Sequence, residues 1–229
     1  ACSGICCGVG HTIGNMSINR PSKISRGLFG YAENATLRNI GVWDVSSTGA
    51  DGGGGLVGHN IANNGTASIA NAYATGQVRG GNYVGGLVGY NHASSGTASI
   101  THAYAAGQVR GWDYVGGLVG YNHASSGKAS ITHAYATGPV GGNGYVGGLV
   151  GYTYAGNGGA SITNAYATGA VSGSGAVGGL VSGSAGGNVT NSFYATTDTD
   201  GNAINSGGIY TPLGQGKTLA ELKQQSTFA

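Results

Sequence analysis

The sequence predicts an all-β fold: a parallel β-solenoid (β-helix) with coils of about 31 residues and a short C-terminal helix. The motif Gly-Gly-Leu-Val-Gly recurs at a constant interval, at residues 54–58, 85–89, 116–120 and 147–151, and with a final serine at 178–182. A second motif keeps the same interval, at residues 67–73, 98–104, 129–135 and 160–166. A fixed period in this range indicates structural units that stack and bury their apolar faces on one another.

Composition narrows the class of protein further. Glycine contributes 50 of the 229 residues, far above its ordinary share of roughly 7%. Charged residues make up only 7% of the chain, so the sequence lacks the basic surface that nucleic-acid binding requires. No apolar run reaches the length of about 18 residues that suggests a membrane-spanning helix. We therefore expect no nucleic-acid partner and no membrane span.

Within one repeat, the order of residue types predicts short strands and turns. Large and small side chains alternate in the second motif, which is typical of a strand with one apolar face, so Ile100 and Tyr104 are both expected to point inward. The Gly85-Gly86 pair is expected to form a bulge or a corner. Helices are not expected in residues 27–197, because glycine costs a helix about 1 kcal/mol relative to alanine.

Stacked coils place equivalent residues about 4.8 Å apart along the solenoid axis, and we call such a set a column. The expected structural columns are Ile69, Ile100, Ile131 and Ile162; Tyr73, Tyr104, Tyr135 and Tyr166; and Val78, Val109, Val140 and Val171. The outermost repeats depart from the interval, as terminal units should: Leu28 precedes Leu56 by 28 residues, and Val189 follows Ile162 by 27.

The C-terminal residues follow a different pattern. Thr218-Leu219-Ala220-Glu221 is a capping-box sequence, which predicts a short helix from Thr218 to about Gln225 that covers the last coil. We therefore divide the chain into an N-terminal capping segment (1–26), a repeat solenoid (27–197) and a C-terminal exit segment with the short helix (198–229).

The repeats resemble the GLUG motif repeats of large bacterial secreted and surface proteins, among them filamentous-haemagglutinin-like adhesins. The similarity rests on Tyr-Val-Gly-Gly-Leu-Val-Gly-Tyr-Asn at 83–91 and 114–122, and on Ser-Ile-Thr-Asn-Ala-Tyr-Ala-Thr-Gly at 161–169. It covers nearly all of the chain after residue 8. The resemblance implies an extracellular β-solenoid, secreted or on the bacterial cell surface. It does not imply one activity, because such repeats occur in proteins of several kinds.

The sequence offers little material for catalysis. A glycosidase or lyase on such a fold needs two or three carboxylates clustered on one strand face. The carboxylates present do not recur between repeats: Glu33, Asp44, Asp51, Asp113, Asp198, Asp200 and Glu221. We therefore expect no enzyme, no catalytic residues and no cofactor.

Metal binding is weighed against hydrogen bonding at the histidines. His92 and His123 stand one coil apart, as do His102 and His133, and two imidazoles so placed could share a metal ion. Asparagines occupy the His102 column in other repeats, which favours hydrogen bonding, so no metal site is expected. The run from Asp198 to Asn202 is interpreted as an acidic turn, with a calcium loop as the alternative.

Two further groups of residues are candidates for interactions. Tyr90, Tyr121 and Tyr152 form a column that would make an aromatic binding stripe if exposed, or an ordinary packed stack if turned inward. Cys2, Cys6 and Cys7 are the only cysteines, and their odd number allows one disulfide together with a free or intermolecular thiol.

The leading hypothesis is a non-enzymatic extracellular module of an adhesin or surface exoprotein, acting as a stiff stalk and a binding surface for a host-surface glycan or protein. The alternative is a structural subunit of an extracellular fibre. Unpaired strand edges at the ends of a solenoid favour self-association along its axis. A third possibility, ice binding, needs a regular array of threonines, and Ala70 interrupts the column that contains Thr101 and Thr132.

Overall fold

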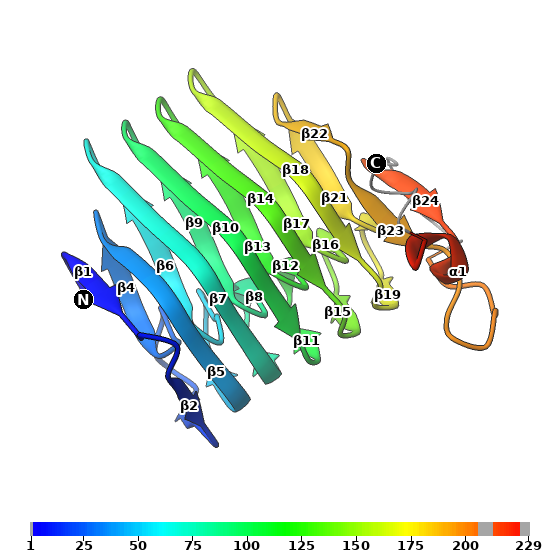
Figure 1. Cartoon of the computed structure of the whole chain (residues 1–229), viewed down its shortest axis with the longest axis horizontal. Helices are drawn as coiled ribbons and strands as arrows, with labels where there is room; N and C mark the ends of the chain where they lie inside the picture. Colours follow the sequence, from blue (N-terminus) through cyan, green and yellow to red (C-terminus); the bar gives the residue numbers. More distant parts are fainter. Residues whose placement is uncertain (1, 206–212, 225–229) are drawn as a thin grey trace.

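The computed structural model describes residues 2–205 and 213–224, and it shows a parallel β-solenoid of about six turns, as the periodicity predicts. Equivalent strands of successive coils lie side by side along the long axis (Figure 1). Ile100 pairs in parallel with Ile69 on one side and Ile131 on the other, which is the 31-residue register of the sequence. Each coil contributes to three sheets, which form the sides of the solenoid.

The first sheet consists of β4 (Phe29–Glu33), β6 (Val57–Ala62), β9 (Val88–Ala93), β13 (Val119–Ala124), β17 (Val150–Ala155) and β21 (Val181–Ala185). The long strands of the second sheet are β5 (Thr36–Gly49), β7 (Thr66–Arg79), β10 (Thr97–Ala106), β14 (Lys128–Ala136) and β18 (Gly159–Ala167). Shorter strands extend this sheet: β11 (Val109–Arg110), β15 (Val140–Gly142), β19 (Val171–Gly173), β22 (Asn188–Thr190), β23 (Phe193–Ala195) and β24 (Gln215–Lys217). The third sheet contains β8 (Asn82–Gly85), β12 (Asp113–Gly116), β16 (Val146–Gly147) and β20 (Val177–Gly178).

The core consists of apolar columns that run the length of the solenoid. Fully buried leucines and isoleucines face one another across it: Leu56, Leu87, Leu118, Leu149 and Leu180, and Ile69, Ile100, Ile131 and Ile162. A separate valine cluster fills one corner: Val78, Val84, Val109, Val115, Val140 and Val146, with Val171 packed against it. Both atypical repeats join the columns in register, since Phe29 pairs with Val57 and Ile162 pairs with Val189.

The paired glycines form the expected corner between the third sheet and the first. β8 ends at Gly85, and the next strand, β9, begins at Val88. A Cβ atom on Gly86 would lie 2.2 Å from the carbonyl oxygen of Gly117 in the next coil, so the coils can stack this closely only with glycine at that place. The recurrence of the motif is therefore a steric requirement of coil stacking.

One sequence prediction about side-chain direction is wrong. Ile100 is fully buried, but Tyr104 is only half-buried and lies on the outer surface. His102, between them, has a left-handed backbone with φ of 49°. This bend interrupts the strand alternation, so that Ala103 points inward and Tyr104 outward. The tyrosine column of the second sheet is thus a surface feature.

The N-terminal segment covers the first complete coil as an incomplete one. β1 (Ile5–Cys7), β2 (Thr12–Gly14) and β3 (Ser17–Arg20) all pair in parallel with β5. The segment ends at Arg26, which is 3% exposed although it carries a charge. Its guanidinium donates to the carbonyl oxygens of Lys23, Asp51 and Arg79 at 3.0, 3.3 and 3.2 Å, which ties the segment to the solenoid.

At the other end, α1 (Leu219–Leu222) begins where the capping box predicts. The Thr218 hydroxyl accepts from the N–H of Glu221, and the Glu221 carboxylate accepts from the N–H of Thr218. Leu222 packs with Phe193 and Ala195 over the last coil. The helix is shorter than expected, and Gln225 itself lies outside the described residues. Within residues 2–205 and 213–224, no helix is long and apolar enough to cross a membrane.

Candidate binding face

The tyrosine column singled out in the sequence lies in register on the outer surface of the first sheet. Tyr90 pairs with Tyr121, and Tyr121 with Tyr152, and all three are half-buried. Tyr31 and His59 occupy the same column in earlier coils. The rings of Tyr90 and Tyr121 stack at a centroid distance of 5.4 Å and an angle of 12°. The outward direction of these side chains follows from the alternation of the strands, whose neighbouring positions point into the core.

A second aromatic column flanks the first. Tyr83, Tyr114 and Tyr145 follow the turns that lead into the third sheet, and their rings stack at 5.1 and 5.4 Å. Tyr114 also contacts Tyr121 at 5.0 Å, so the two columns form one surface. Tyr83 and Tyr114 have left-handed backbones, with φ of 56° and 52°. Such a conformation is unfavourable for a bulky residue, and strain of this kind is often found at functional sites.

A third column, of mixed type, completes the surface. His92 and His123 stack at 4.6 Å, and Tyr154 follows His123 in the next coil. The Tyr90 hydroxyl and His123 Nδ1 are 2.5 Å apart, within hydrogen-bond distance, which links the first column to the third. We name the combined surface the aromatic face; its members are Tyr31, His59, Tyr83, Tyr90, His92, Tyr114, Tyr121, His123, Tyr145, Tyr152 and Tyr154.

The ionisable groups of the aromatic face are held neutral. Burial lowers the pKa of His59 to about 4, and burial together with the neighbouring His92 does the same for His123. Burial also raises the pKa of the Tyr90 and Tyr121 hydroxyls, and adjacent tyrosines add to the effect. The surface is therefore uncharged at neutral pH, a property that suits a partner recognised by ring stacking and neutral hydrogen bonds.

The face ends in a hollow of about 520 Å³. In the last complete coil, Gly183 occupies the position of Tyr152, and the register of Val146 with Val177 places Ala176 next to Tyr145. The lost rings leave a recess whose walls are Tyr145 and Tyr152, and serines surround it.

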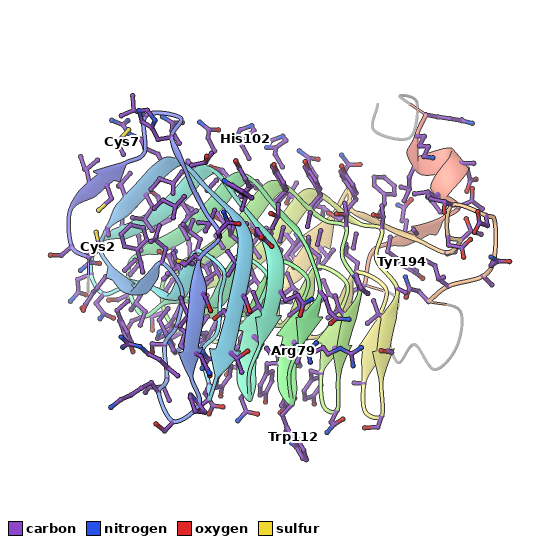
Figure 2. All side chains as sticks on the ribbon, turned by 90° about the horizontal axis from the view of Figure 1, so that it is seen from below. Cys2, Cys7, Arg79, His102, Trp112 and Tyr194 are labelled. Atoms are coloured by element: carbon purple, nitrogen blue, oxygen red, sulfur yellow. The ribbon has the colours of Figure 1, made fainter. Side chains whose placement is uncertain are left out.

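The second histidine column lies on another face. His102 and His133 stack at 4.9 Å with an angle of 3°, and Figure 2 shows His102 projecting outward. Left-handed residues fill the whole column: Asn39, Asn71, His102, His133, Asn164 and Asn191. Asparagine and histidine are among the residues that tolerate this conformation best, which explains their exchange. In the part of the chain that the structure describes, no group of three or more His, Cys, Asp or Glu side chains could hold a metal ion.

The acidic turn has no spare ligand geometry. The Asp198 carboxylate accepts from the backbone N–H groups of Asp200 and Asn202, at 2.9 and 2.8 Å, and from the Asn202 amide at 3.0 Å. Its hydrogen-bonding capacity is thus used within the turn, and the same bonds, with those to the Asn202 side chain foremost, lower its pKa.

The cysteines separate into two kinds at the N-terminal end (Figure 2). Cys2 and Cys6 lie with their Sγ atoms 2.6 Å apart and pack against the core, and the contact with Cys6 raises the pKa of Cys2 to about 11. Cys7 alternates to the exposed side of β1, where the Val9 N–H and, to a lesser degree, the Arg38 side chain lower the pKa of its thiol.

Sequence reasoning missed a polar column inside the core. Asn60, Asn91, Asn122 and Thr153 are fully buried, and the amide of each asparagine donates to the residue in the next coil, at 2.8, 2.8 and 3.4 Å. The signal was present, since Asn91 and Asn122 follow the tyrosines of the repeated motif. Their inward direction follows from that of the tyrosines, which point outward.

The fold and its columns define a parallel β-solenoid repeat protein, and residues 80–110, 113–140 and 142–172 match the GLUG motif. The chain therefore contains three consecutive GLUG repeats. No curated protein matches it.

Two solved structures share the fold. A candidate immunoglobulin A1 protease from Bacteroides ovatus is 22% identical, with a TM-score of 0.70 over 94% of this chain and 69% of that one. An IgA1 protease is 23% identical, with a TM-score of 0.52 over 90% of this chain and 17% of the other, so this chain spans only a small part of that protein. Identities this low establish a common fold and nothing about activity.

Proposed function

We propose that this chain is a non-enzymatic module of a bacterial surface or secreted protein, and that it binds an uncharged partner surface through the aromatic face. The observation that carries the proposal is the outward, half-exposed position of Tyr90, Tyr121 and Tyr152 within one continuous layer of stacked rings. Aromatic side chains contribute much of the contact energy of binding surfaces, because they provide large and rigid areas at little cost in conformational entropy.

The regular fold supports the proposal from a second side. Backbone hydrogen bonds run between coils throughout the repeats, so the rings are displayed on a stiff support. A stiff support reduces the entropy lost on binding. The GLUG repeats and their occurrence in adhesin-like proteins agree with an extracellular stalk and binding surface.

Binding to host cells tests the proposal. The labelled chain is incubated with cultured epithelial cells and measured by flow cytometry, next to a Tyr90→Ala/Tyr121→Ala variant. Tyr104→Ala is the matched control, because it removes the same side chain from the outer surface of the second sheet. We expect the double variant to lose most of the binding and the control to keep it, with similar melting temperatures. Equal binding by all three proteins would contradict the proposal.

The alternative, a fibre subunit, is favoured by one specific observation. β1, β2 and β3 pair only with β5 among the described strands, which leaves their other edges open. Exposed apolar side chains gather at this end: Ile5, Val9, Ile13 and Ile24. Open edges next to apolar side chains favour pairing with a second copy.

Self-association along the axis separates the two functions. We expect sedimentation velocity to show assembly that decreases when Cys2, Cys6 and Cys7 are replaced by serine and a bulky N-terminal tag is added. Undiminished assembly after both changes would assign the contact to a lateral face, such as the aromatic face, in place of the N-terminal end.

A further inference from the structure

The hollow at the end of the aromatic face has the form of a ring-binding corner. Tyr152 leaves the stack of its column, since its ring is tilted by 58° from that of Tyr121. It stands instead at 69° to the ring of Tyr145, with a centroid distance of 4.8 Å. Two rings at this angle present one wall and one edge to the same space.

The change from tyrosine to glycine in the last coil makes this arrangement possible. A Cβ atom on Gly183 would lie 2.8 Å from Cε2 of Tyr152, so the Tyr152 ring lies directly over the glycine. Ala176 leaves further room next to Tyr145, because the equivalent residues of the preceding coils are tyrosines. The hollow therefore exists because both aromatic columns stop at the same coil.

Neutral polar groups surround the rings. Ser174 and Ser184 are among the lining residues, and their hydroxyls donate to the carbonyl oxygens of Asn143 and Gly187 at 3.3 and 3.0 Å. With their protons so engaged, the hydroxyl oxygens still have lone pairs that can accept hydrogen bonds from a ligand. None of the residues that line the hollow is charged.

A negative charge lies directly behind the aromatic wall. The Asp113 carboxylate accepts from the backbone N–H groups of Tyr114 and Tyr145, both at 2.9 Å. A fixed carboxylate at this distance disfavours a second negative charge in the hollow. The site thus selects against acidic ligands.

We propose that this hollow binds one neutral hexopyranose unit of a glycan, an inference that rests on the proposed function of the aromatic face. The apolar face of the sugar ring packs on Tyr152 against the edge of Tyr145, and its hydroxyls donate to the serine oxygens. The volume of about 520 Å³ lies within the range of small-ligand sites. Sialylated, sulfated and uronic sugars are excluded by the Asp113 charge.

The experiment begins with an array of neutral, sialylated and sulfated oligosaccharides, and the strongest neutral oligosaccharide is then titrated by calorimetry. Ala176→Tyr and Gly183→Tyr fill the hollow with the residue that the preceding coils carry in the same columns. Ala185→Tyr is the matched control, because it follows Tyr154 in the third column and lies outside the hollow. Melting temperatures show that each variant is folded.

We expect the two filling variants to weaken binding by at least roughly tenfold, and the control to leave the dissociation constant unchanged. Absence of neutral glycans among the bound oligosaccharides, a preference for acidic ones, or unchanged binding by Ala176→Tyr would each overturn the inference. If the filling variants still bind cells as the unaltered chain does, and Tyr90→Ala/Tyr121→Ala does not, the proposed function stands and the hollow is not its sugar site.

Discussion

The side-chain amide of Asn91 donates a hydrogen bond of 2.8 Å to the Oδ1 atom of Asn122, and both side chains are fully buried. Each asparagine thus serves its two neighbours, as donor on one side and acceptor on the other. Such a column fixes the axial register of the coils, because a slip would leave buried amides without partners.

Asn91→Ala tests the contribution of this column to stability. The substitution removes the acceptor of the Asn60 amide and the donor to Asn122, and each buried polar group left without a partner costs about 1–3 kcal/mol. We expect a lower free energy of unfolding in chemical denaturation. Asn157→Ala, at an exposed turn position, is the control and should have little effect. Equal stability of the two variants would show that the column contributes nothing.

Ile131→Asp should be strongly destabilising. The side chain is fully buried between Ile100 and Ile162, so the substitution places an unpaired charge in the core at a cost of several kcal/mol. His133→Asp is the matched control, because residue 133 is exposed and left-handed, a conformation that aspartate tolerates. Thermal melting measures both, and an unchanged melting temperature for Ile131→Asp would rule out the inward position.

The buried histidines predict a loss of stability in acid. The pKa of His59 and of His123 is lowered to about 4 in the folded chain, against about 6.5 in an unfolded one. Between these values the unfolded state takes up protons that the folded state does not, so the free energy of unfolding decreases as the pH falls through this window. Above it, these histidines add no pH dependence.

Denaturation at a series of pH values measures this slope. Replacing His59 and His123 together by glutamine should reduce it, because glutamine does not titrate. The same slope in the unaltered chain and in the double variant would assign the acid sensitivity to other groups.

Cysteine alkylation should separate the three thiols. Cys7 is exposed and the pKa of its thiol is lowered, whereas contact with Cys6 raises the pKa of Cys2 to about 11. Because the thiolate is the reactive form, iodoacetamide near neutral pH should modify Cys7 first. Mass spectrometry of the reduced chain follows the reaction. The fast phase should disappear in Cys7→Ser and persist in Cys2→Ser; its survival in Cys7→Ser would contradict the assignment.

The sequence by itself determined the repeating framework of this protein. A constant interval of 31 residues places each residue beside its equivalent in the next coil, so the isoleucine, valine and tyrosine columns follow from arithmetic alone. The glycine corner and the helix cap could be predicted for a related reason. Both depend on the conformational and hydrogen-bonding properties of a few adjacent residues, which the sequence shows directly.

The tertiary structure decided which way the columns face and what lies next to them. Strand alternation predicts that Tyr104 points inward, but the left-handed bend at His102 reverses the direction of every later side chain in that strand. No local pattern announces such a bend where histidine replaces asparagine. The contact of Cys2 with Cys6, the merging of aromatic columns into one face and the hollow beside Tyr152 depend on packing across turns and between coils. Backbone direction and long-range packing, which periodicity does not specify, therefore decide the candidate site.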